Sequence, residues 1–192
     1  MRFKPLLLCL VASLALASQL SADILTTAAN NNGLAGAGSG VYFDLTNETG
    51  AALTIQSIQT SVFALAAGDP VTADIWVRDD SYVGNDASSA GWTLLGSVGG
   101  TASANTFGTF GFLTDFDMPD YLLGAGQTNG FAIFTDFGIA YTGTGANPPQ
   151  DTWTDGSLTL FGNQATGTAF SGTGFSPRTF SGSITYTAIP EP

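Results

Sequence analysis

The sequence has 192 residues and contains no histidine. Its single cysteine is Cys9, and its four basic residues are Arg2, Lys4, Arg78 and Arg178. Without histidine the chain cannot form a Ser-His-Asp triad or a histidine-ligated zinc or iron site. After the first 22 residues it also lacks a cysteine nucleophile, a lysine for a Schiff base and the lysine of a phosphate-binding P-loop. These absences exclude most of the common catalytic groups.

Residues 1–22 have the pattern of a secretory signal peptide. Arg2 and Lys4 form the positive region, residues 6–17 form the apolar region, and small residues lead to a predicted cleavage after Ala22. The apolar run is shorter than the about 20 residues that span a bilayer. We therefore expect an exported protein whose mature chain begins at Asp23, with no permanent membrane span in this sequence.

The mature chain is strongly acidic. Removal of residues 1–22 leaves two basic residues against 15 acidic ones, hence a net charge of −13. Such a chain has no electrostatic footprint for nucleic acid, and anionic lipid would repel it. Charged residues make up only 10% of the sequence, so it is not the highly charged kind of disordered chain.

Alternation of apolar and polar residues is the main structural signal. In residues 180–187, Phe180, Ile184 and Tyr186 fall on one side, and hydroxyl side chains fall on the other. Roughly ten such short segments, separated by glycine-rich turns, run through the chain. They predict one all-β domain over residues 23–188, an antiparallel β-sandwich that is jelly-roll-like, with no helix beyond the signal peptide.

The pattern also gives local expectations. A change of apolar phase between Ile55 and Ile58 predicts a bulge or bend. We expect an edge or bent strand at 107–112, an acidic connector at 115–121 and a long loop at 142–155. The residues predicted to pack in the core are Phe63, Phe131, Ile133, Phe137, Leu158, Leu160 and Ile184.

Three ordered motifs resemble a known family. They are Tyr82-Val-Gly84 ahead of Trp92-Thr-Leu-Leu-Gly96, then Ala125-Gly-Gln127, then Pro177-Arg-Thr-Phe-Ser-Gly182. In this order they resemble exported bacterial β-sandwich domains of the PEP-CTERM type.

The resemblance implies how the protein is sorted. Pro190, Glu191 and Pro192 follow the last predicted strand and match the start of a PEP-CTERM signal, covering residues 189–192. In that family a hydrophobic segment and a basic tail come next, and an exosortase removes them. The resemblance thus implies an exosortase-type partner and a place at the cell surface, or outside the cell, of a Gram-negative bacterium.

Carboxylates in loops could hold calcium, which takes oxygen ligands. The candidate ligands form two groups, Asp79, Asp80 and Asp86 in one predicted loop and Asp115 and Asp117 in another. Neither group has the spacing of a helix–loop–helix calcium site. The alternative is that these acids only keep a lysine-poor surface soluble.

Aromatic rings in loops could stack on a sugar, and an extracellular polysaccharide is the partner that such rings would imply. Trp153 is the best candidate, with Tyr141 and Tyr82 in support. The alternative is that these rings cap the ends of the sandwich. Arg178 is expected to pair with a carboxylate, and the Asn47-Glu-Thr49 sequon to form a turn.

We expect a non-enzymatic protein of the cell surface or extracellular matrix, without a cofactor other than, at most, calcium. A carbohydrate-binding module, with or without calcium, is the alternative. An Asp-based glycoside hydrolase comes third, because such an enzyme needs two carboxylates across the scissile bond and no pair stands out.

Overall fold

The computed structural model describes residues 21–27, 33–34, 36–63, 66–103, 114–143 and 150–189. The predicted leader up to residue 20, the predicted strand at 107–112 and the motif Pro190, Glu191 and Pro192 lie outside these ranges. All regular structure within them is strand. They contain no helix long and apolar enough to cross a membrane.

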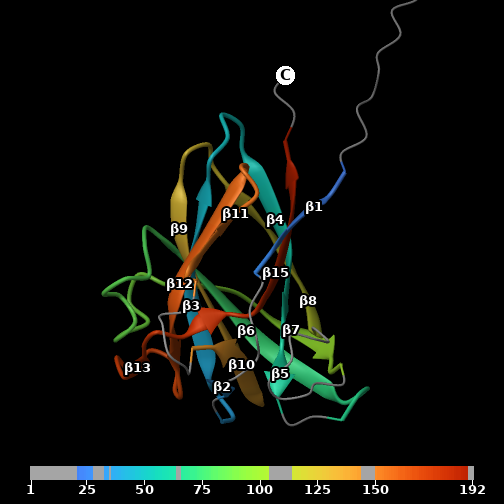
Figure 1. Ribbon diagram of the computed structural model, residues 1–192, viewed down its shortest axis with the longest axis vertical. Helices are drawn as coiled ribbons and strands as arrows, with labels where there is room; N and C mark the ends of the chain where they lie inside the picture. The colour runs from blue at the N-terminus through green and yellow to red at the C-terminus, as the bar shows by residue number, and fades with distance from the viewer. Residues whose placement is uncertain are drawn as a thin grey trace, which may run out of the picture.

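Two antiparallel sheets form a sandwich, as predicted (Figure 1). The first sheet has four strands in the order β1 (Asp23–Thr26), β15 (Gly182–Ala188), β4 (Leu53–Thr60) and β8 (Thr114–Leu123). The second has the order β11 (Thr152–Thr154), β12 (Leu158–Thr166), β3 (Gly40–Asn47), β9 (Thr128–Thr135), β6 (Pro70–Asp79) and β7 (Thr93–Thr101), with β13 (Gly174–Phe175) also on β12. Consecutive long strands repeatedly change sheet, as they do in jelly-roll-like folds.

Four short strands close one end of the sandwich. β10 (Gly138–Thr142) pairs with β2 (Gly33–Leu34), β5 (Val62–Phe63) and β14 (Thr179–Phe180). In Figure 1, β2, β5 and β10 lie at the end opposite to the start of β1 and the end of β15. The two ends of the sandwich are therefore different.

The core fills the space between the sheets. Phe43 of β3 stacks on Phe131 of β9 with ring centroids 5.8 Å apart, and it meets Phe180 at 4.8 Å. The predictions of burial are confirmed for five residues, Phe131, Ile133, Leu158, Leu160 and Ile184. The side chain of Phe63 lies outside the described part of the chain.

The prediction that Phe137 is buried is wrong, since 38% of its surface is exposed. β9 ends at Thr135, so Phe137 lies in the bend before β10, where strand alternation no longer applies. The long loop predicted at 142–155 is also interrupted, because residues 152–154 form strand β11.

The acidic connector predicted at 115–121 is wrong too, because these residues lie within strand β8. Phe116 and Met118 point into the core, and Asp115 and Asp117 point out. Pro119 lacks a backbone N–H, but β8 is an edge strand, where proline is tolerated. The register of β8 against β4 shifts between Ile55 and Ser57, which confirms the predicted bulge.

Candidate functional site

The outer face of the second sheet carries a second group of packed rings, here called the outer aromatic cluster. Its buried members are Tyr42, Tyr82, Trp92 and Phe134, and its half-buried members are Trp76, Phe161 and Phe170. Tyr42 lies near its centre, with ring centroids 6.1 Å from Tyr82, 5.8 Å from Trp92 and 5.6 Å from Phe134. The outer face of this sheet therefore carries an apolar group of its own, separate from the core between the sheets.

The central strands produce this cluster because they are apolar on both faces. Tyr42 lies between the inward-facing Val41 and Phe43, and Trp76 lies between Ile75 and Val77. A strand with large apolar side chains on both faces must be covered on both faces. Two loops, 80–92 and 167–173, provide the cover on the outer side.

The first of these loops is tied to the sheet through Asp44 of β3. The hydroxyl of Ser81 donates to one carboxylate oxygen at 2.6 Å, and the backbone N–H of Tyr82 donates to the other at 2.8 Å. Desolvation by burial raises the pKa of Asp44, against the lowering effect of these two hydrogen bonds. The buried Asp44 carboxylate thus supplies the hydrogen-bond acceptor that water would otherwise provide at the start of the loop.

Further contacts hold the rings beneath the loop. The indole N–H of Trp92 donates to the carbonyl of Asn85 at 2.8 Å, and the guanidinium carbon of Arg78 lies 5.6 Å from the centre of the Trp92 ring. Gly130 of β9 lets the loop approach, because a Cβ there would lie 2.7 Å from the backbone nitrogen of Tyr82. The cluster is thus a fixed, built feature of the fold.

A groove of about 290 Å³ opens at the edge of the cluster. Its apolar wall is made by Trp76 of β6, Phe134 of β9 and Phe170 of the second loop. The ring of Phe170 lies 5.1 Å from Trp76 and 5.2 Å from Phe134, both in edge-to-face orientation. This volume is near the lower limit of ordinary small-ligand pockets, which begin at about 300 Å³.

Two carboxylates line the same groove. Asp74 lies opposite Phe134 in the sheet and accepts a hydrogen bond from the Ser97 hydroxyl through Oδ1. Asp136 accepts the backbone N–H of Thr72 at 2.9 Å, also through Oδ1, and its own N–H returns a bond to the Thr72 carbonyl. Both acids are therefore positioned, and Oδ2 of each has no hydrogen-bond partner among the described residues.

Phe170 has an unusual backbone. Its φ angle is 53°, in the left-handed region that a bulky residue rarely adopts. Its N–H donates to the Tyr42 hydroxyl at 3.0 Å, which ties this conformation to the outer aromatic cluster. Such strain is most often found where a side chain must be held in place for function.

None of the three rings predicted to bind sugar lines the groove, and all three are buried. Trp153 in β11 is 7% exposed and packs in the core between the sheets, Tyr141 is 5% exposed, and Tyr82 is 1% exposed. None of them presents an open face to solvent in this structure, which corrects their assignment to exposed loop sites. The cause is that β11 turns Trp153 inward and loop 80–92 turns Tyr82 onto the sheet.

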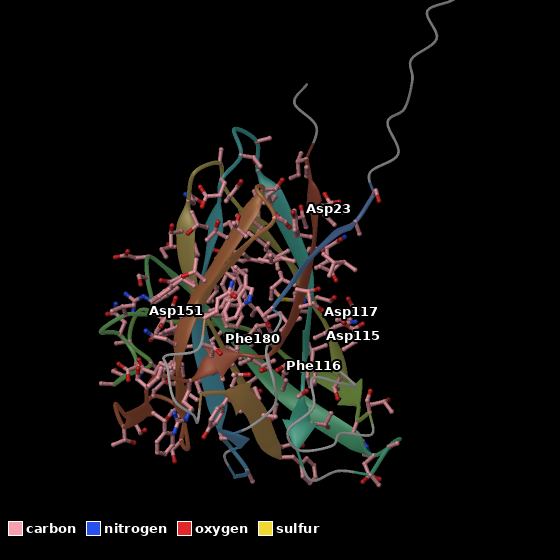
Figure 2. All side chains as sticks on the ribbon, in the orientation of Figure 1. Asp23, Asp115, Phe116, Asp117, Asp151 and Phe180 are labelled. Atoms are coloured by element: carbon pink, nitrogen blue, oxygen red, sulfur yellow. The ribbon has the colours of Figure 1, made fainter. Side chains whose placement is uncertain are left out.

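The predicted calcium ligands do not gather in one place. Asp79 ends β6, Asp80 and Asp86 lie in loop 80–92, and Asp115 and Asp117 lie on the outer side of β8. Figure 2 shows Asp115 and Asp117 together at one side of the molecule. Among the described residues, no group of three or more acids is arranged to hold a metal ion.

Two further expectations can be compared with the structure. Arg178 donates to the carbonyls of Gly143 at 2.6 Å and Pro177 at 2.7 Å, and the predicted pairing with a carboxylate is not found among the described residues. It still fixes the segment before the last strand. Asn47 is fully buried, and its amide is engaged within the turn that begins there, which agrees with the turn prediction.

The sequence pattern places Trp76 on the outer face of β6, but it does not distinguish an exposed ring from a covered one. Phe170 follows a Gly- and Thr-rich stretch without a strand period, so no local signal identifies it. The strand pattern gives no signal for Asp136, because this residue lies in a two-residue bend between β9 and β10.

Comparison with known proteins gives little. No protein-family model matches the sequence, and no curated protein matches it. A solved structure of infectious bursal disease virus, Gt strain, is similar at a TM-score of 0.28 and 11% identity, over 91% of this chain and 43% of the viral chain. This chain therefore spans less than half of the viral one, and a likeness so weak supports no statement about fold or function.

Proposed function

We propose that this chain is an exported, non-enzymatic domain displayed at the bacterial cell surface or in the extracellular matrix through a PEP-CTERM-type signal. One observation carries the proposal, namely that both ends of the domain leave it together, far from the groove. β1 begins at Asp23, directly after the predicted cleavage site, and pairs with the last strand at Tyr186. The N–H of Ile189 donates to the carbonyl of Ala52, next to the β3–β4 turn.

The groove lies toward the other end of β3. Gly40 pairs with Phe134 in the groove wall, and Asn47 at the opposite end of this eight-residue strand precedes the β3–β4 turn. A rise of about 3.4 Å per residue separates the ends of β3 by roughly 24 Å. A domain attached to the cell through its C-terminal end would therefore present the groove away from the attachment point.

Secretion and cleavage can be tested in a bacterium that carries an exosortase. We expect the extracellular protein to begin at Asp23, and Ala22→Tyr to retain the leader, whereas Asp23→Asn should be processed normally. A wild-type protein that stays in the cytoplasm with residues 1–22 attached would contradict the proposal.

Sorting is tested separately in the full gene product. The sequence has only two glutamates, so that Glu191 can be tested with Glu48 as the control position. Glu191→Ala should release the protein from the cell surface, and Glu48→Ala should not. Equal surface display of both variants would remove the sorting signal from the proposal.

The groove favours carbohydrate binding as the task within this role. A partly accessible aromatic wall beside carboxylates suits a sugar, because the rings can cover its apolar face and the acids can accept its hydroxyl groups. Calorimetry against a polysaccharide panel should give binding that Trp76→Ala abolishes and Leu94→Ala retains, since Leu94 is an exposed side chain outside the groove. Release of reducing ends, lost in Asp74→Asn, would favour the Asp-based hydrolase instead.

A further inference from the structure

The groove combines apolar rings with unpaired negative charge. Its lining contains three aromatic residues and two aspartates but no basic residue. Within the described part of the chain, neither Asp74 nor Asp136 forms an ion pair. A ligand that entered without positive charge would leave both carboxylates partly desolvated and uncompensated, which is costly.

The rest of the protein also favours a cationic ligand. The mature chain has a net charge of −13, so long-range attraction would draw cations to it and repel anions. The two mature arginines are used elsewhere, Arg78 over the Trp92 ring and Arg178 over the Tyr141 ring. Neither of them lines the groove.

The aromatic wall limits what kind of cation fits. An ammonium group is attracted to the face of an aromatic ring as well as to a carboxylate. The apolar face of a sugar ring packs on the same surface. A ligand that carries both features in one unit satisfies the whole lining, and a bare metal ion does not.

We propose that the groove binds a saccharide that bears a protonated amine, such as an unacetylated hexosamine residue within a polysaccharide. The sugar ring packs on Trp76 and Phe170, and its ammonium group donates to the free Oδ2 of Asp74 or Asp136. This inference rests on the proposed carbohydrate-binding role and names the class of sugar.

Calorimetry with three matched tetrasaccharides tests the proposal. They are the β-1,4-linked tetramer of glucosamine, its N-acetylated form, which keeps the backbone but loses the charge, and the neutral tetramer of glucose. We expect the glucosamine tetramer to bind at least about tenfold more tightly than the other two, as befits a charge-assisted hydrogen bond. Its affinity should fall as pH rises and the amine loses its proton.

The variants separate a specific site from general attraction to an acidic surface. Trp76→Ala and at least one of Asp74→Asn and Asp136→Asn should weaken binding about tenfold or more, while Asp117→Asn, on β8 of the other sheet, should not. Asp136→Asn keeps an oxygen for the Thr72 N–H, so it is the variant least able to disturb the fold. Melting curves identify any variant that unfolds.

The outcomes are distinguishable. Equal binding of all three tetramers would overturn the cationic ligand and leave carbohydrate binding in place. If none of the three tetramers binds and no neutral polysaccharide binds either, both the cationic ligand and the carbohydrate-binding role would be overturned. Glucosamine binding that survives all three groove variants would mean nonspecific attraction and would also overturn the proposal. Surface display through Glu191 is measured independently of all of these results.

Discussion

The carboxylate of Asp44 accepts a 2.8 Å hydrogen bond from the backbone N–H of Tyr82, which lies 38 residues further along the chain. Because Asp44 points out of the second sheet, this bond ties loop 80–92 over the outer aromatic cluster. The Tyr82 hydroxyl then reaches Asn163 of β12, donating to its side-chain oxygen at 3.1 Å and accepting its backbone N–H at 3.2 Å.

Asp44→Ala should loosen this loop and destabilise the domain. The change leaves the Tyr82 N–H and the Ser81 hydroxyl without their acceptor, which costs about 2 kcal/mol in the free energy of unfolding. Urea unfolding measures it, and Asp80→Asn is the control, since the exposed Asp80 carboxylate binds only the neighbouring Ser81 N–H and asparagine tolerates the φ of 93° at this position. Equal losses in the two variants would contradict the role given to Asp44.

The domain should lose stability in alkali. Burial above all raises the pKa of Tyr42 and of Tyr82 to about 12, from an ordinary value of 10.0. The unfolded chain therefore loses these two protons before the folded chain does, so the free energy of unfolding falls as pH rises from 10 towards 12.

Phenolate absorbance and urea midpoints across that range check this expectation. Tyr42→Phe should reduce the fall, because it removes one of the tyrosines whose pKa is raised in the folded protein. If the phenolate absorbance lost in Tyr42→Phe or in Tyr82→Phe developed near pH 10 in the folded protein, the burial assigned to that tyrosine would be incorrect.

Asp155 should support the fold at neutral pH and not in acid. Although desolvation raises its pKa, hydrogen bonds from the Leu158 N–H, the Tyr186 hydroxyl and the Ser157 N–H together lower it below 3.8. The unfolded chain binds the proton first, so this contribution is present above pH 3.8 and is lost as pH falls through the folded-state pKa.

Asp155→Asn should therefore reduce stability at pH 7 by less than about 1 kcal/mol, a small effect because the side chain is largely exposed. The difference from wild type should shrink in acid. Asp117→Asn on the outer side of β8 is the control. A difference that is constant from pH 7 to pH 3 would exclude the charged carboxylate as its cause.

Asn47 should matter for folding and not as a glycan acceptor. Its side-chain amide donates to the carbonyls of Ala51, Leu123 and Gly124, at 2.8, 3.1 and 3.0 Å. Asn47→Ala leaves these carbonyls short of a donor, and we expect a loss of about 3 kcal/mol in the free energy of unfolding. Glu48→Ala, one residue away, should change it by less than about 0.5 kcal/mol.

Folded mature protein should resist trypsin. Arg78 and Arg178 are its only cleavage sites; Arg78 lies in β6 and Arg178 is bonded to two carbonyls. Both side chains are half-buried, and cleavage requires the backbone to open locally. Gel analysis should show cutting only under partly denaturing conditions. Rapid cutting after Arg78 at neutral pH would contradict the position of β6 within the sheet.

Much of the fold could be predicted because strand alternation is local information. Val41, Phe43 and Leu45 alternate within five residues, and their burial follows from that spacing alone. The prediction of a connector at 115–121 was wrong because it rested on three acids and a proline. Phe116 and Met118 follow the strand alternation, which indicates a strand there. Charge on the solvent side of an edge strand is compatible with the sheet.

The groove could not be predicted in the same way. Alternation puts Trp76 on the outer face of β6, but whether that face meets solvent or a loop depends on Asp44, Gly130 and loop 80–92. Trp153 and Tyr82 show the consequence, because both looked like exposed loop rings and both are buried. Whether a ring is buried depends on the residues that pack on it, and for these two rings those residues lie far away in the chain.

The amino-acid sequence was enough to establish an all-β chain, its strand faces, and its lack of histidine and, after residue 22, of lysine, because each depends on residue type or on near neighbours. The tertiary structure alone decided which rings form the groove. Trp76, Phe134 and Phe170 come from β6, β9 and a distant loop, and only sheet pairing and loop closure bring them together beside Asp74 and Asp136. Contacts of this range are set by the packing of the whole domain, which no local period records.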